Sequence, residues 1–128
     1  MLNLNKNTRL FFFQYIFQRD YTTDFELDDF VKKNLRKRPC NKKKLRSMYQ
    51  SFVVNEITIK ELINDEILKK TNKISIFLVY AFYSEYLIDK SKKRMLMSEY
   101  IKLSKDFLTI DEVKFFNFLL DSIAKKAP

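Results

Sequence analysis

Glycine is absent from this 128-residue chain, and proline occurs only twice. Glycine-rich phosphate loops, dinucleotide-binding fingerprints and primed hairpin turns all require glycine at defined positions. The sequence therefore excludes these motifs and favours helices joined by short polar turns.

Histidine is also absent, and Cys40 is the only cysteine. Zinc sites of cysteine or histidine ligands, a disulfide within the chain and histidine-based catalytic triads are thus excluded. Carboxylates and lysines remain, but no two carboxylates share an otherwise apolar helical face, so we interpret them as solvated surface groups. We expect no enzyme, cofactor, metal site or small-molecule substrate, and Cys40 is interpreted as an incidental thiol in a reducing compartment.

Hydrophobic runs in the sequence are too short to cross a membrane. The uncharged run from Ile74 to Ser84 ends at Glu85 and is much shorter than the roughly 20 residues that a spanning helix needs. The N-terminal string LFFFQYIF contains Gln14 and lacks the small-residue cleavage site of a signal peptide. We therefore expect a cytoplasmic protein without a membrane partner.

Positive charge is in excess, because the chain has 25 lysines and arginines but 16 acidic residues, which gives a formal net charge of +9. Such an excess indicates a polyanionic partner, since lysine and arginine release counterions from phosphates. Charge alone does not choose among RNA, DNA and anionic lipid, and a solvated lysine-rich surface would give the same excess. The most basic segment, between Lys32 and Arg46, is either a phosphate-contacting surface or a solvated helix end.

Apolar residues recur at helical spacing along most of the chain. The first predicted helix runs from about Asn7 to Gln18, with Asn5 or Asn7 as its N-cap. It is expected to be buried on most sides, with Arg9 near its exposed N-terminal end. Asn72 is predicted to cap the segment ISIFLVYAFYSEYL, whose apolar character on nearly every side is typical of a helix in the middle of a bundle. With 46% hydrophobic residues, residues 1–128 are expected to form one all-α domain.

A capping box at Thr23 and Glu26 predicts the start of a further helix, which Pro39 ends. A longer helical pattern follows from Leu45 to Ile67, with a possible kink near Asn55. These segments are joined by short polar stretches, as expected for a helical bundle.

The C-terminal quarter, from Met95 to Ala124, predicts two amphipathic helices joined by a tight turn and therefore an antiparallel pair. A capping box at Thr109 and Glu112 marks the start of the second helix. Each predicted apolar face has four residues at helical spacing: Leu96, Tyr100, Leu103 and Phe107, and then Val113, Phe116, Leu120 and Ile123. Phe115 and Phe118 lie to the side of the second face.

Two strings in this quarter, EYIKLSKDF and KFFNFLLDSIA, resemble the closing signature of the bacterial transcription antitermination factor NusB family. In that family, E-x-I-x-L-A-K-x-F precedes K-F-x-N-G-x-L-D. The N-terminal string TRLFFFQYIFQRDY is similar to the family's opening, R-x-x-A-x-Q-x-L-Y, and matches it in order at Arg9, Gln14, Ile16 and Phe17.

The sequence departs from the family pattern at several positions. Phe118 stands where the family has glycine, and the N-terminal arginine cluster is thinned to Lys6 and Arg9. In the part that helps form the family's surface for a ribosomal protein, Val79 and Ser84 replace an arginine and a glutamate.

The resemblance implies an all-α bundle of about seven helices in two packed subdomains, with a non-enzymatic function. It further implies binding of the single-stranded boxA sequence of nascent ribosomal RNA together with ribosomal protein NusE, in an antitermination complex with RNA polymerase. Base stacking on Phe115 and phosphate contacts by lysine agree with the way proteins read single-stranded RNA. The residues expected to contact RNA are Lys6, Arg9, Phe17, Asp111, Lys114, Phe115 and Asn117.

Three alternatives remain open. One is the NusB-like domain of ribosomal RNA methyltransferases. The lack of a glycine loop for a methyl donor argues against this alternative. Another is a divergent homologue that serves as a protein-interaction or general RNA-binding module without boxA specificity. The third is a small basic DNA-binding helical protein. For Phe115, packing against a neighbouring helix is as compatible with the spacing as RNA contact, and Asn117 fits a cap or a buried polar anchor.

Overall fold

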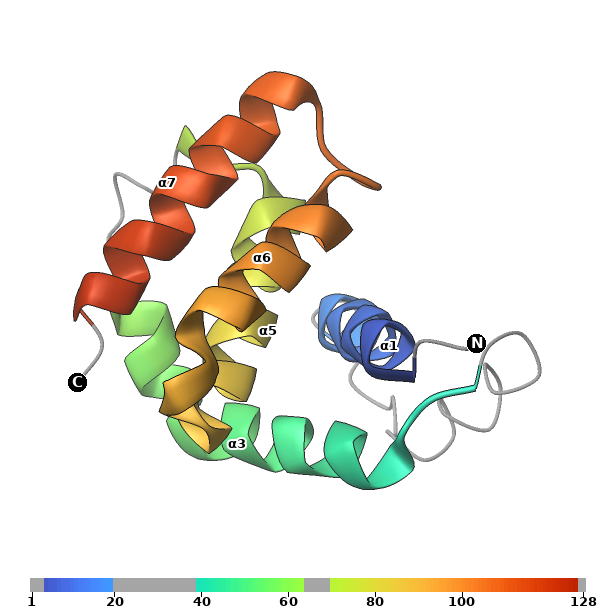
Figure 1. Cartoon of the computed structure of the whole chain (residues 1–128). Coiled ribbons are helices and arrows are strands. Elements are labelled where there is room, and N and C mark those ends of the chain that lie inside the picture. Colours follow the sequence, from blue (N-terminus) through green and yellow to red (C-terminus); the bar gives the residue numbers. More distant parts are fainter. Residues whose placement is uncertain (1–3, 20–38, 64–69, 127–128) are drawn as a thin grey trace.

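A computed structural model describes residues 4–19, 39–63 and 70–126, and these ranges are mostly helical (Figure 1). They contain five α-helices and one short 3-10 helix: α1 (Leu4–Arg19), α3 (Lys42–Glu61), α5 (Lys73–Ile88), η1 (Lys90–Lys92), α6 (Lys93–Ser104) and α7 (Ile110–Lys126). The all-α prediction is confirmed, with five of the roughly seven expected helices in the described ranges. The capping box at Thr23 and Glu26 lies outside them, as does the basic segment from 32 to 38.

Helix α5 lies at the centre of the fold and contacts α1, α3, α6 and α7 (Figure 1). Its side chains are apolar on nearly every side, and Leu78, Val79 and Phe82 are completely buried. The Asn72 side chain caps the helix by accepting a hydrogen bond from the backbone N–H of Ser75 at 2.8 Å. The predicted cap and the predicted central position of this helix are both confirmed.

Helix α1 begins at Leu4, so Asn5 and Asn7 lie inside the helix and the prediction that one of them is its N-cap is wrong. Asn7 instead donates its side-chain amide to the carbonyl oxygen of Pro39 at 3.0 Å, which ties α1 to the segment before α3. Every residue from Thr8 to Phe13 is buried. The helix is therefore enclosed on most sides as expected, but Arg9 is enclosed with it.

Helix α3 runs unbroken through Asn55, where the sequence pattern allowed a kink. The Asn55 side chain donates to the carbonyl oxygen of Ser51 at 2.8 Å, one turn earlier, and so stays within the helix. The buried face consists of Leu45, Met48, Phe52 and Ile59. This face packs against α1 and α5.

Helices α6 and α7 pack against each other in antiparallel orientation, as predicted (Figure 1). On α6, Leu96, Tyr100 and Leu103 are buried, but the helix ends at Ser104. Phe107 therefore lies in the turn after the helix, where its ring centroid is 5.2 Å from that of Phe13. On α7, the expected core positions Phe116, Leu120 and Ile123 are buried, and Val113 is half-buried.

The predicted capping box at the start of α7 is confirmed in both directions. The backbone N–H of Thr109 donates to Glu112 Oε1 at 2.9 Å, and the N–H of Glu112 donates to Thr109 Oγ1 at 3.2 Å. Glu112 Oε2 also accepts a hydrogen bond from the Asn72 amide at 2.9 Å, so the starts of α5 and α7 are joined. Among the described helices, none combines the length and apolar character of a membrane span.

Candidate functional site

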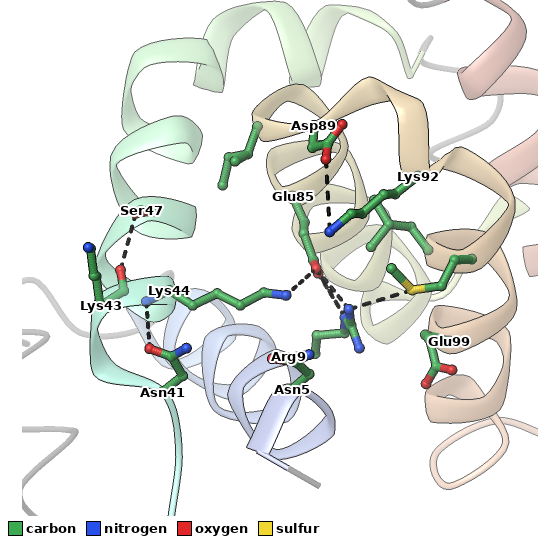
Figure 2. Close-up of a pocket in the computed structure, with 13 residues that line it drawn as sticks. Asn5, Arg9, Asn41, Lys43, Lys44, Ser47, Glu85, Asp89, Lys92 and Glu99 are labelled. Carbon is green, nitrogen blue, oxygen red and sulfur yellow. Dashed lines mark hydrogen bonds and ion pairs between the residues drawn. The ribbon is translucent and has the colours of Figure 1, made fainter.

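A single carboxylate, Glu85, is buried among the apolar residues of α5, with 5% of its surface exposed. The guanidinium of Arg9 on α1 donates three hydrogen bonds to it, from Nε to Oε1 at 2.9 Å and to Oε2 at 3.2 Å, and from Nη2 to Oε2 at 3.0 Å (Figure 2). Lys44 Nζ on α3 lies 3.0 Å from Oε2, and the Tyr100 hydroxyl on α6 donates to Oε1 at 2.9 Å. The Glu85 cluster, which we define as these four residues, therefore joins four helices at one carboxylate.

The electrostatics of the Glu85 cluster keep its ion pairs charged. Burial alone would raise the pKa of Glu85, but the hydrogen bonds and charges of Arg9 and Lys44 outweigh burial and hold this pKa below its usual value. Burial opposes the charge on Arg9, yet the hydrogen bonds and charge of Glu85 raise the pKa of the guanidinium above its ordinary value. Burial and the Glu85 charge raise the pKa of Tyr100 well above its usual range, so its hydroxyl stays protonated and donates.

An open pocket of about 560 Å³ lies beside the Glu85 cluster (Figure 2). Its charged lining residues are nearly balanced, with four cations and three anions: Arg9, Lys43, Lys44 and Lys92 against Glu85, Asp89 and Glu99. Lys44 is paired with Glu85, and Lys92 Nζ lies 3.9 Å from Asp89 Oδ2. The nearly balanced charge of this pocket therefore does not favour an anionic ligand. The buried ion pairs at its wall link helices to one another. No cluster of three or more potential metal ligands occurs among the residues that the structure describes.

The first half of α7 exposes aromatic and basic side chains together. Lys114, Asn117 and Phe118 are exposed and Phe115 is half-buried. We call these four residues the α7 surface. The ring centroids of Phe115 and Phe118 lie 6.3 Å apart, with 35° between the ring planes. Lys114 and Phe118 are four residues apart and so lie one turn apart on the same side of the helix. Aromatic rings beside lysines are the elements that bind single-stranded nucleic acids.

The residues that the sequence predicts to contact RNA fall into two groups. Asp111 is exposed in the first turn of α7 and lies near Lys114, Phe115 and Asn117 on the same helix. The other group is on α1, and Figure 1 shows α6 between α1 and α7. The structure thus brings together the α7 candidates but separates them from those of α1.

The three candidates on α1 differ in accessibility. Lys6 is exposed, whereas Arg9 is 4% exposed and paired with Glu85, so the expectation that Arg9 lies at an exposed helix end is wrong. Phe17 is half-buried, with its ring centroid 5.3 Å from that of Phe77. Lys6 is therefore the exposed candidate on this helix.

Sequence reasoning missed the Glu85 cluster. Glu85 and Arg9 are 76 positions apart, and only the packing of α1 on α5 brings them together. The available signal was a lone acid in an otherwise apolar helix, since a buried carboxylate requires a cation nearby. The first helix offered Arg9 as such a cation.

Comparison with known proteins gives one detailed likeness. No family model and no curated protein matches the chain. Among solved structures, T. maritima NusB superposes with a TM-score of 0.80 at 25% sequence identity, over 100% of this chain and 96% of that chain. The chain is thus an all-helical protein with the NusB fold. This likeness in fold and sequence spans the whole chain and agrees with the resemblance of the signatures at both ends to those of the NusB family.

Proposed function

We propose that this protein is a non-enzymatic RNA-binding factor of the transcription antitermination type. The observation that carries the proposal is the full-length likeness to T. maritima NusB. The finer proposal is that it binds single-stranded boxA RNA together with ribosomal protein NusE, within the antitermination complex of RNA polymerase.

The α7 surface supplies the chemistry for this binding. The Phe115 ring stacks on an unpaired base, and the exposed ammonium of Lys114 contacts a neighbouring phosphate. The Asn117 amide has both donors and an acceptor for base edges. The Asp111 carboxylate only accepts hydrogen bonds, so it selects base amino groups or ribose hydroxyls and repels phosphate.

The N-terminal helix contributes charge and position. Lys6 is exposed and provides a second phosphate contact. Arg9 reaches a phosphate only if its ion pair with Glu85 breaks, so we assign it the role of fixing α1 on α5. Phe17 lines an apolar hollow of about 190 Å³ with Phe13 and Phe107, and its contact with RNA stays a prediction.

The test is a titration of a short boxA-like RNA and of a scrambled control, each at two salt concentrations. Tighter binding to the boxA-like RNA is expected, and Phe115→Ala should weaken it by about 5- to 100-fold, the range that loss of one stacked base covers. Val54→Ala on α3 is the matched control, because Val54 is 81% exposed and lies on a different helix. Unchanged affinity of Phe115→Ala would contradict the proposed role of this ring.

A second candidate function is a NusB-fold module that binds RNA generally, or binds proteins, without boxA specificity. The pairing of Arg9 with Glu85 favours it, because the thinned N-terminal cluster then presents less charge to RNA. Equal and salt-sensitive binding to both RNAs would support this candidate. Equal affinity for DNA of the same sequence at matched salt would instead support a general nucleic-acid-binding protein.

A further inference from the structure

The Phe118 ring is 65% exposed, although α7 has a well-packed inner face. An apolar ring left in water forgoes the hydrophobic stabilisation that burial would provide. Phe118 also stands where the NusB signature given above has glycine. Within the α7 surface, the proposed function assigns a contact to Lys114, Phe115 and Asn117 but none to Phe118.

The surroundings of Phe118 are aromatic on one side and basic along the helix. The Phe115 ring is its neighbour, at a centroid distance of 6.3 Å. Lys114 lies one turn before Phe118, and Lys125 lies two turns after it on the same side of α7. Lys125 is paired with Asp121 at 3.0 Å, whereas Lys114 borders a hollow of about 350 Å³ that also has Lys105 at its edge. Two lysines, Lys105 and Lys114, therefore lie at the N-terminal side of the ring pair.

We infer that Phe115 and Phe118 form a two-ring platform that stacks two successive bases of single-stranded RNA, with Lys114 on the phosphate backbone. This inference rests on the proposed RNA-binding function and adds a second stacking residue to it. Paired aromatic side chains on one surface hold successive bases in this way in other RNA-binding modules. Since every base has a π-face, Phe118 adds affinity with little sequence preference.

Charge favours RNA over a second copy of this chain as the occupant of the platform. The ring pair adjoins Lys114, and Lys105 borders the adjacent hollow. The whole chain carries a formal net charge of +9, which attracts phosphates and opposes the close approach of a second copy.

The experiment uses the full chain and a set of ten-nucleotide boxA-like RNAs, each with one abasic position moved along the strand. For the unmodified protein, two adjacent abasic positions should each weaken binding by about 5- to 100-fold. Phe118→Ala should weaken binding to the intact RNA and abolish the sensitivity at one of these positions while retaining it at the other. Phe118→Leu keeps apolar area but has no ring to stack on a base, so it should lose affinity as Phe118→Ala does. Phe118→Tyr keeps the ring and should retain affinity.

Val54→Ala on α3 is the control, because Val54 is aliphatic, 81% exposed and on a different helix. It should leave RNA affinity unchanged. The inference is overturned, and the proposed function kept, if Phe115→Ala weakens binding while Phe118→Ala and Phe118→Leu bind like the unmodified protein. If the unmodified protein binds none of the RNAs, both proposals fail. If Phe118→Ala turns a dimer into a monomer without loss of RNA affinity, the ring is a self-association contact and the inference is wrong.

Discussion

Removing one member of the Arg9–Glu85 pair should destabilise the fold far more than removing both. Glu85→Met leaves the Arg9 guanidinium buried without its carboxylate partner, and the one hydrogen bond that the described residues still offer it is the weak contact to Met95 Sδ at 3.9 Å. Breaking a buried pair in this way costs about 3–5 kcal/mol. Arg9→Met likewise leaves the Glu85 carboxylate buried without its main partner, but Glu85 retains Lys44 and Tyr100. The cost of Arg9→Met should therefore lie at the lower end of that range.

The double substitution Arg9→Met/Glu85→Met removes both buried charges and keeps unbranched side chains in their place. Its remaining cost is the Tyr100 hydroxyl without its acceptor, about 1–3 kcal/mol, since Lys44 is partly exposed and can turn to water. The double variant should therefore be more stable than Glu85→Met alone, with a coupling of at least about 3 kcal/mol between the two positions.

Urea unfolding of the four proteins, followed by circular dichroism, measures this coupling from the free energies of unfolding. The dependence of the free energy of unfolding on urea concentration should be the same for all four proteins, because the surface exposed on unfolding hardly changes. If the two single costs add to the double cost within about 0.5 kcal/mol, the pair is not coupled and the reasoning on the Glu85 cluster is refuted.

Three other predictions concern pH, capping and charge. The pKa of Glu85 is lower in the folded chain than its ordinary value of 4.5, so the contribution of Glu85 to the free energy of unfolding is fully present above about pH 4.5 and is lost as pH falls toward the folded pKa. The free energy of unfolding should therefore fall less steeply with acid for Glu85→Met than for the unmodified protein. Parallel curves for the two proteins would contradict this. Thr109→Ala should lower the free energy of unfolding by about 1 kcal/mol by removing the α7 cap, whereas Thr109→Ser should retain it, and equal melting of the two variants would argue against the cap. Lys114→Ala should reduce the slope of log affinity for RNA against log salt concentration by about 1, and an unchanged slope would exclude a phosphate contact at this position.

Local patterns in the sequence were sufficient to predict much of the fold. The Asn72 cap and the capping box at Thr109 and Glu112 depend on residues three positions apart, so each could be read directly from the chain. The apolar faces of the C-terminal helices were predicted for the same reason, except at Phe107, where α6 had already ended. Helix ends depend on turns and tertiary contacts, which spacing does not encode.

The candidate site was harder to predict, because the burial of a charged residue is a tertiary property. Arg9 was expected at an exposed helix end, but α5 offers it Glu85 and the two are buried together. Asn7 was expected to cap α1 but bonds to Pro39, which is 32 positions away. By contrast, the α7 candidates are neighbours on one helix, so their proximity followed from the sequence alone.

The central claim, antitermination-type RNA recognition, is tested most directly by the affinity ratio between boxA-like and scrambled RNA, measured at one salt concentration with and without NusE. We predict that the ratio exceeds one for the protein alone and increases when NusE is added. A ratio of one in both conditions would contradict the account and leave a basic helical protein with the NusB fold but without boxA recognition.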